Sequence, residues 1–190
     1  MKKLQVIAGG TSGMGLATAI ALGKYGPVLV GGRNEKRLEN ALATLREAGV
    51  EAFGKTVDIA DRASLDEFAA YAASIAPLGN VLNAAGVDAG GADLIIGVNM
   101  VGTVNFVEAF FPYMEAGARL VNFSSLTGYF VQPTPEEKEL WDNTADLEFF
   151  EKVKVAIQNR EVPEAMKHMG EDYLYYPISK TFTQYYTRAN

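Results

Sequence analysis

Cysteine is absent from this chain of 190 residues, and histidine occurs once, as His168. The missing thiol excludes a cysteine nucleophile, a zinc knuckle and an iron–sulfur cluster. A hydrolase with a Ser-His-Asp triad is also disfavoured, because the single histidine lies in a polar, charged stretch that is typical of a solvated surface. We therefore expect no metal centre, and we interpret His168 as a surface residue.

Positive charge is scarce as well. The chain carries 17 Lys and Arg against 23 Asp and Glu, which gives a formal net charge of -6, and it contains no basic run. Proteins that bind nucleic acid need clustered positive charge to neutralise the phosphates. We expect no nucleic-acid partner.

Long hydrophobic runs are also missing. A membrane span needs about 18 to 20 consecutive apolar residues, and no stretch of this sequence approaches that length without a polar interruption. The first residues include Lys2 and Lys3, as a secretory signal would, but Gln5 and Gly9 leave too short an apolar segment. We expect no membrane partner, and the cytoplasm is the default location for a cysteine-free chain without an address signal.

What the sequence does contain is an alternation of short apolar runs with longer helical patterns. The runs favour strands at 4–8, 28–30, 52–57, 81–85 and 120–123, and the patterns favour helices at 15–25, 35–48, 62–76 and 98–115. Asn34 and Asp61 are candidate caps of two of these helices. Continuous apolar strands separated by helices predict an α/β fold, a Rossmann-like doubly wound parallel sheet, within a single domain over 1–190.

A segment at 129–172 has a different composition. It holds the only tryptophan, Trp141, and eleven of the 23 acidic residues, and it lacks a clear strand. Pro135 followed by Glu136 and Glu137 is a favourable helix start. We predict two or three short amphipathic helices, inserted between a strand and the last helix.

The first strand runs into a glycine-rich stretch that precedes a helix. The stretch contains Gly9, Thr11, Ser12, Gly13, Met14 and Gly15. Glycines at such a turn let the backbone approach a pyrophosphate, and the free N–H groups of the helix N-terminus attract negative charge. We interpret this stretch as a nucleotide-binding turn; the alternative is a plain glycine-rich turn. The Gly-x-x-x-Gly-x-Gly spacing resembles that of the short-chain dehydrogenase/reductase family.

The second strand ends in Gly31-Gly32-Arg33-Asn34, with no acidic residue. In dinucleotide folds an acid at this place binds the ribose 2′-hydroxyl, whereas a small residue followed by Arg accommodates a 2′-phosphate. NADP(H) is therefore favoured, and NAD(H) stays possible. Arg33 as a solvated turn residue is the alternative.

Four further motifs resemble the same family at the same relative places. Asp58, followed by Ile59, matches the adenine-contacting acid; it could also be a helix cap, and the two roles are not exclusive. Asn83-Ala84-Ala85-Gly86 is similar to Asn-Asn-Ala-Gly and departs from it at Ala84. Asn99 matches an asparagine that distorts its helix and holds a water, and Ser125 matches the catalytic serine.

Tyr176 and Lys180 form a Tyr-x-x-x-Lys motif at the start of the last predicted helix. Side chains four residues apart share a helix face, so Lys180 can lie beside Tyr176. A phenol is a poor acid or base near neutrality, and a neighbouring ammonium group favours its ionised form. Tyr175 cannot replace Tyr176, because Ser179 stands four residues after it.

The resemblance covers the whole chain except the insertion, and it implies a reversible carbonyl/alcohol oxidoreductase acting on a small molecule. In that chemistry Tyr176 exchanges a proton with the substrate oxygen, Ser125 binds the same oxygen, Lys180 binds the nicotinamide ribose, and Asn99 supports a water chain. Gly86, Tyr176 and Lys180 would also contact the coenzyme.

The chain departs from the family pattern in two ways. The segment at 129–172 resembles an insertion found in monomeric carbonyl reductases and bacterial hydroxysteroid dehydrogenases, where it covers a helix face that other members use to form dimers. We expect a monomer or a dimer, and we infer that this interface is blocked. The sequence also stops within the last helix, before the sixth and seventh strands of the family, so we expect a chain truncated at residue 190.

Two other functions compete with catalysis. A non-catalytic NADPH-binding regulatory protein could use the same fold, but it would not need the residues Asn99, Ser125, Tyr176 and Lys180. A nucleotide-sugar epimerase is disfavoured by the glycine spacing. Tyr129, Phe130, Trp141, Phe149 and Phe150 could form an apolar wall for the substrate, or could simply pack the inserted helices.

Overall fold

The computed structural model describes residues 2–161 and 171–189, so His168 lies outside the described residues. The chain divides into two compact units. The sheet unit comprises Met1–Ala85 and Asn105–Phe123, and the helical unit comprises Gly86–Val104 and Ser124–Asn190. Each unit is described by itself.

The sheet unit contains five parallel strands in the order β3-β2-β1-β4-β5. The strands are β1 (Leu4–Ala8), β2 (Val28–Gly32), β3 (Ala52–Thr56), β4 (Leu78–Asn83) and β5 (Arg119–Asn122). This arrangement confirms the predicted doubly wound fold. The order reverses between β1 and β4, and in such sheets ligands bind beyond the carboxyl ends of the strands at that switch point.

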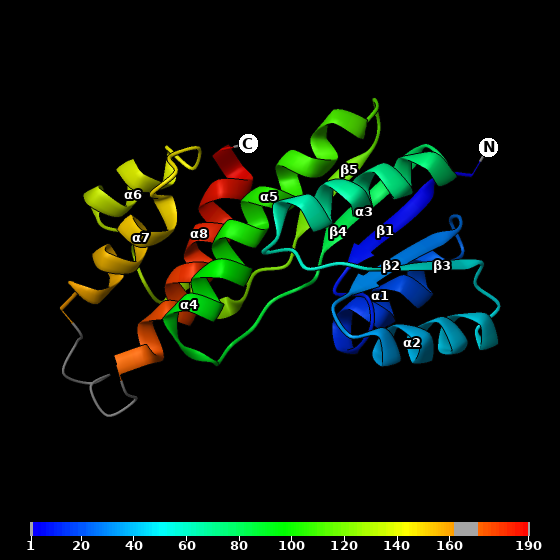
Figure 1. Cartoon of the computed structure of the whole chain (residues 1–190), viewed down its shortest axis with the longest axis horizontal. Coiled ribbons are helices and arrows are strands. Elements are labelled where there is room, and N and C mark those ends of the chain that lie inside the picture. Colours follow the sequence, from blue (N-terminus) through cyan, green and yellow to red (C-terminus); the bar gives the residue numbers. More distant parts are fainter. Residues whose placement is uncertain (1, 162–170, 190) are drawn as a thin grey trace. The chain divides into compact units, whose positions relative to one another are not determined.

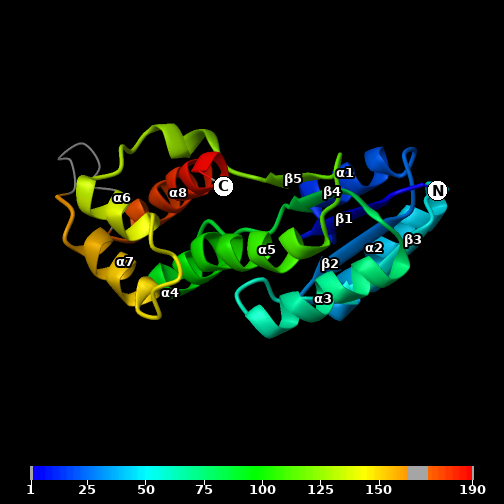
Figure 2. The same ribbon diagram turned by 90° about the horizontal axis from the view of Figure 1, so that it is seen from above.

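Three helices connect these strands: α1 (Gly13–Leu22), α2 (Glu35–Glu47) and α3 (Arg62–Ile75). Figures 1 and 2 show α1 and α2 on one face of the strands and α3 on the other. The two predicted caps are confirmed, because the Asn34 side chain accepts a hydrogen bond from the Arg37 N–H and Asp61 accepts from Ala63 and Ser64. Such caps satisfy N–H groups that have no partner within the helix.

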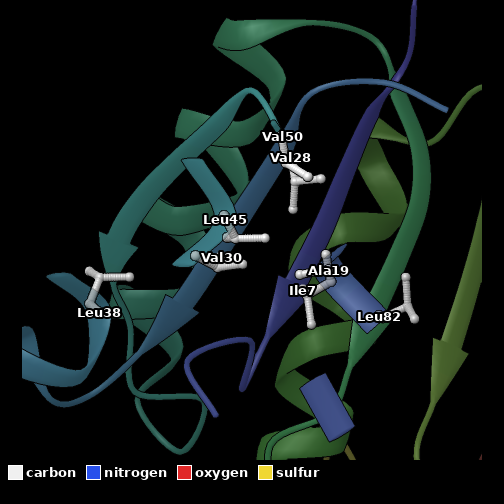
Figure 3. Close-up of a cluster of buried hydrophobic side chains, with 8 residues drawn as sticks. All are labelled: Ile7, Ala19, Val28, Val30, Leu38, Leu45, Val50 and Leu82. Atoms are coloured by element: carbon white, nitrogen blue, oxygen red, sulfur yellow. The ribbon is translucent and has the colours of Figure 1, made fainter. Parts of the chain in front are cut away.

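The core between the strands and the first two helices consists of aliphatic side chains (Figure 3). The cluster comprises Ile7, Ala19, Val28, Val30, Leu38, Leu45, Val50 and Leu82. Val28 and Val30 reach this cluster because they are two residues apart and therefore share a face of β2. Gly31 faces the other layer, where an added Cβ would meet Phe68 of α3 at 2.7 Å.

A long apolar helical stretch runs from Gly91 to Tyr113 and belongs to both units. It comprises α4 (Gly91–Ile96), a π-helical turn η1 (Gly97–Val101), α5 (Gly102–Phe110) and a 3-10 turn η2 (Phe111–Tyr113). The predicted helix at 98–115 began too late, because the glycines that precede α4 weaken the helical pattern there. By length and mean hydropathy (1.6) this stretch could cross a membrane, but 61% of its apolar window is buried, as in the core helix of a globular protein.

The helical unit also holds η3 (Leu126–Tyr129), α6 (Pro135–Trp141), α7 (Phe149–Gln158), η5 (Glu171–Leu174) and α8 (Tyr175–Ala189). The helices predicted for 129–172 are thus confirmed over its described part. Pro135 occupies the first turn of α6, and Thr134 and Glu137 form a reciprocal capping box before it.

The inserted helices pack on α8 and α4 (Figures 1 and 2). The buried Trp141 ring lies edge-on to Phe182 of α8, at 5.5 Å between ring centroids. The Arg160 guanidinium donates to both carboxylate oxygens of Glu137, at 3.0 and 3.1 Å. Glu137 is only 1% exposed, so this ion pair is internal to the insertion and ties its two helices together.

Candidate functional site

The glycine-rich turn lies at the switch point of the sheet, between β1 and the segment that follows β4. Gly9 has a φ of +77°, and a Cβ there would meet the Ala85 nitrogen at 2.5 Å. A Cβ on Gly15 would collide with the carbonyl oxygen of Gly9. Both positions therefore require glycine, because the backbone itself fills the space of a side chain.

Gly13 differs from these two glycines. Its φ is +51°, but an added Cβ would meet nothing within 4 Å. Ser12 precedes α1 in an extended conformation and makes no side-chain cap hydrogen bond. The first turn of α1 therefore has no cap from the Ser12 side chain, and an N-terminus of this kind can bind an anion. The residues present fit the pyrophosphate of a dinucleotide.

Other predicted coenzyme contacts surround the same edge of the sheet. The N–H groups of Gly9 and Gly10 both donate to the Gly31 oxygen of β2, at 2.9 and 3.1 Å. The Thr11 side chain lies against Gly32, because a Cβ added to Gly32 would meet that side chain at 2.9 Å. Met14 is 72% exposed beside them. The first strand-to-helix turn is therefore bonded directly to the end of β2.

Beyond β2, Arg33 is exposed and Asn34 caps α2. Beyond β3, Asp58 accepts a hydrogen bond from the Ala60 N–H at 3.0 Å, and Ile59 is buried. The alternative that Asp58 caps a helix is wrong, because Asp61 caps α3. Asp58 instead closes a short turn at the carboxyl end of β3.

The motif after β4 completes this edge. The Ala84 N–H donates to the Ala8 oxygen at 2.9 Å, and the Ala85 N–H donates to Oδ1 of Asn83 at 3.3 Å. The structure thus brings Asn83, Ala84 and Ala85 to the Gly9 turn. In the sheet unit all predicted coenzyme residues lie at or beyond the carboxyl ends of the strands, Asn83 being the last residue of β4.

In the helical unit, Tyr176 and Lys180 lie on one face of α8, as predicted. The Lys180 Nζ is 5.6 Å from the centroid of the Tyr176 ring. Lys180 is 6% exposed, and burial lowers the pKa of its ammonium group from the ordinary value. A Cβ on Gly86 would meet the Lys180 Nζ at 3.1 Å and Oδ1 of Asn99 at 3.3 Å. Gly86, Asn99 and Lys180 are therefore brought together.

Asn99 lies within the π-helical turn η1, so the predicted distortion of the helix is confirmed. Its Oδ1 accepts from the Val87 N–H at 2.9 Å, and its Nδ2 donates to the Val87 oxygen and to Oγ of Ser179, at 2.8 and 3.0 Å. Asn99 is 2% exposed, and both Nδ2 hydrogens are used in these bonds. It fastens the loop after β4 to α8.

Ser124 and Ser125 have different partners. The Ser124 hydroxyl donates to the Lys180 oxygen at 2.8 Å. The Ser125 Oγ accepts from the N–H and the hydroxyl of Thr127, at 3.2 and 3.0 Å. The Ser124 hydroxyl is thus bonded to α8, whereas the Ser125 hydroxyl is bonded within its own loop.

Two residues of α8 that the motifs did not single out also hold this loop. Thr181 donates to the Gly128 oxygen at 3.0 Å, and the Gln184 amide donates to the Ser125 oxygen at 3.1 Å. A Cβ on Gly128 would meet the Lys180 backbone at 2.8 Å, so the loop packs directly on the helix. The spacing of Gln184 eight residues after Tyr176, on the same face, is the signal that could have found it.

The proposed aromatic wall separates into two groups. Trp141 and Phe149 are 2% and 5% exposed and pack within the insertion, so the packing alternative is right for them. Phe150 is half-buried. Tyr129 and Phe130 are 60% and 57% exposed, a few residues after Ser125. Among residues 2–161 and 171–189, no three acidic or histidine side chains group as metal ligands would.

Comparison with known proteins agrees with this geometry. Residues 3–136 match the family model described as short chain dehydrogenase. The chain belongs to the short-chain dehydrogenase/reductase family. The match ends before α8, so the assignment of Tyr176 and Lys180 as site residues rests on their spacing and their geometry.

Curated relatives include a protein of Streptomyces coelicolor named as a ketoacyl reductase. It is 33% identical over 144 residues, which are 66% of this chain and 54% of the relative. The C alpha-dehydrogenase of Sphingobium is 34% identical over 140 residues, 65% of this chain and 45% of that protein. The chain thus spans about half the length of these relatives.

Solved structures show the same fold. Menthone neomenthol reductase from Mentha piperita aligns over 100% of this chain and 84% of its own, with a TM-score of 0.75 and 20% identity. A variant of actinorhodin polyketide ketoreductase, solved with NADPH, aligns over 93% of this chain and 67% of its own, with a TM-score of 0.61 and 25% identity.

Proposed function

We propose that this short-chain dehydrogenase/reductase uses NADP(H) to interconvert a ketone or aldehyde with the corresponding alcohol. The observation that carries the proposal is the pairing of Tyr176 with the buried Lys180 on α8, beside Asn99 and Gly86. Family membership supports an oxidoreductase. The ketoreductase relatives, one of them solved with NADPH, favour carbonyl chemistry and this coenzyme.

The sheet unit supplies the residues that would hold the adenosine and pyrophosphate. Open space at Gly13 and the uncapped N-terminus of α1 suit the two phosphates. Gly9 and Gly15 keep the backbone free of side chains there. When bound, the nicotinamide ring accepts or delivers the hydride.

The residues of the helical unit handle the proton. In the reducing direction the Tyr176 phenol donates its hydrogen to the substrate oxygen, and the Ser125 hydroxyl donates a second hydrogen bond to the same atom. Lys180 would stabilise the phenolate that remains and, as in the family pattern, would bind the nicotinamide ribose. Because Asn99 binds the N–H and the oxygen of Val87 and also Oγ of Ser179, it positions the loop after β4 against α8.

The coenzyme preference rests on Arg33. Arg33 is exposed after the end of β2, and Gly32 before it carries no carboxylate that would repel a 2′-phosphate. We expect NADPH to bind at least about tenfold more tightly than NADH, since the phosphate pairs with the guanidinium. Dissociation constants measured for wild type and Arg33→Ala test this preference. Equal affinities in wild type, or a preference that Arg33→Ala leaves intact, would remove the argument.

Turnover tests the reaction itself. The protein expressed from its complete reading frame should consume NADPH, followed at the nicotinamide absorbance band, with at least one member of a panel of aliphatic, cyclic and aromatic ketones. The competing proposal is a regulatory protein that binds NADPH without turnover. Tight NADPH binding with no reduction of any ketone, and no oxidation of the matching alcohols with NADP⁺, would favour the regulatory protein.

A further inference from the structure

Helix α8 carries a third polar side chain on the face that presents Tyr176 and Lys180. Gln184 follows Lys180 by four residues, as Lys180 follows Tyr176, and side chains at this spacing line one helix face. The Gln184 Nε2 donates to the main-chain oxygen of Ser125 at 3.1 Å. One helix face therefore carries the proposed acid–base pair and also contacts the serine that would bind the substrate oxygen.

The Gln184 bond is part of a wider attachment of the loop at 124–131 to α8. The Ser124 hydroxyl donates to the Lys180 oxygen at 2.8 Å, and Thr181 contacts the oxygens of Gly128 and Val131 at 3.0 and 3.3 Å. A Cβ on Gly128 would meet the Gln184 Nε2 at 2.7 Å. The amide of Gln184 thus fills the crevice between the loop and the helix.

The contact with Ser125 is separate from the bonds that form the turn itself. The Ser125 oxygen also accepts the Gly128 N–H at 3.1 Å, which closes η3 without help from α8. The Ser125 Oγ is held from the loop side by Thr127. Among the hydrogen bonds of the described residues, the Gln184 bond joins the Ser125 main chain directly to the helix that bears Tyr176, and the Ser124–Lys180 bond supports the same peptide from the preceding residue.

We infer that Gln184 is a positioning residue, which sets the Ser125 hydroxyl in register with Tyr176 and Lys180 along α8. This inference rests on the proposed function, because the register matters only if both hydroxyls bind one substrate oxygen. Donors to a developing charge act through their fixed placement, so a small displacement of Ser125 weakens catalysis more than binding.

Two substitutions and a matched control test this role in the protein expressed from its complete reading frame. Gln184→Met keeps the length of the side chain and removes the donor. Gln184→Glu keeps the shape and places a carboxylate against the Ser125 oxygen, but regains a donor hydrogen when it is protonated. Gln158→Met makes the same change at an exposed residue that ends α7.

We expect Gln184→Met to lower kcat about tenfold, through displacement of Ser125, with the NADPH dissociation constant within about twofold of wild type. Amide exchange in the segment 124–131 should become faster in this variant and stay unchanged in Gln158→Met. For Gln184→Glu, kcat relative to wild type should rise as the pH falls from about 8 to about 5.5, because the protonated carboxyl donates again. If the Gln184 side chain only filled space, kcat of Gln184→Glu relative to wild type would not change with pH.

The outcomes separate this inference from the proposed function. A wild type that reduces no ketone contradicts the proposed function, and exchange in 124–131 then still shows whether Gln184 holds the loop. Active wild type together with unchanged kcat in Gln184→Met overturns the inference alone. The inference is also overturned if kcat of Gln184→Glu relative to wild type does not change with pH. The same conclusion follows if amide exchange in 124–131 of Gln184→Met matches that of the Gln158→Met control.

Discussion

The two units hold their own predicted functional residues by opposite means. In the sheet unit the turn at Gly9–Gly15 depends on the absence of side chains, because backbone atoms occupy the space where two of the Cβ atoms would lie. In the helical unit, Asn99, Ser125 and Lys180 are held by polar side chains that donate to a hydroxyl or to main-chain oxygens across long sequence separations. A nucleotide turn can therefore be built by local geometry, whereas an acid–base set needs tertiary contacts.

The strongest test of this comparison is the pair Gly9→Ala and Gly13→Ala. Gly9→Ala should destabilise the sheet unit by about 3 kcal/mol or more, since the Cβ overlaps the Ala85 backbone and φ is positive. Gly13→Ala should cost only about 1 kcal/mol, the left-handed strain alone. Denaturant unfolding measures both. Equal costs would show that the backbone of Ala84 and Ala85 does not fill the space beside Gly9.

The next largest effect concerns the buried ion pair of the insertion. Glu137→Ala should destabilise the helical unit by about 3 kcal/mol, because it leaves the Arg160 charge without its carboxylate. Glu139→Ala, at an exposed position of the same helix, should be nearly neutral. Hydrogen exchange should increase in α6–α8 and stay unchanged in β1–β4. Faster exchange in the strands instead would mean that the two units do not respond separately.

A smaller effect is expected at the cap of α2, where a side chain acts locally within the sheet unit. Asn34→Ala should lower stability by about 1 kcal/mol, because the Arg37 N–H loses its acceptor. The control is Asn40→Ala, an exposed position within the same helix, where alanine should be neutral or stabilising. Thermal unfolding measures the change in stability of the two variants. If Asn40→Ala costs as much as Asn34→Ala, the cap is not the cause.

The smallest effect is the pH dependence that Lys180 contributes. Burial lowers the pKa of Lys180 in the folded state, so between that lowered pKa and 10.5 the folded state binds fewer protons than the unfolded state. Stability therefore rises with pH across this window. We expect the stability of wild type relative to Lys180→Met to increase from pH 7 towards pH 10.5, measured by urea unfolding. A relative stability that falls with pH would indicate that Lys180 is stabilised as an ammonium ion.

Much of the fold could be predicted from the sequence, because it depends on local patterns. Continuous apolar strands, the cap at Asn34 and the glycine spacing each carry their own signal within a few residues. The start of α4 could not be predicted in this way. Two glycines with positive φ, Gly90 and Gly91, stand there, and tertiary packing of Ile95 and Ile96 compensates for the weak local pattern.

The candidate site could be predicted in its residue types but not in its contacts. The motifs identify Tyr176, Lys180 and Ser125, and the structure adds what holds them. The bonds of the Asn99 carboxamide to Val87 and Ser179 have no signal in the sequence, because the partners lie 12 and 80 residues away. The same holds for the bond between Gln184 and Ser125.

The most direct test of the central claim compares Tyr176→Phe with Tyr175→Phe. The two tyrosines are adjacent, but only Tyr176 shares its face of α8 with Lys180. We predict that Tyr176→Phe lowers kcat by about a thousandfold, since the proton donor is lost, and leaves the NADPH dissociation constant within about twofold. Tyr175→Phe should keep kcat near that of wild type. Full turnover in Tyr176→Phe, or an equal loss in both variants, would contradict the assignment of the acid–base role to Tyr176.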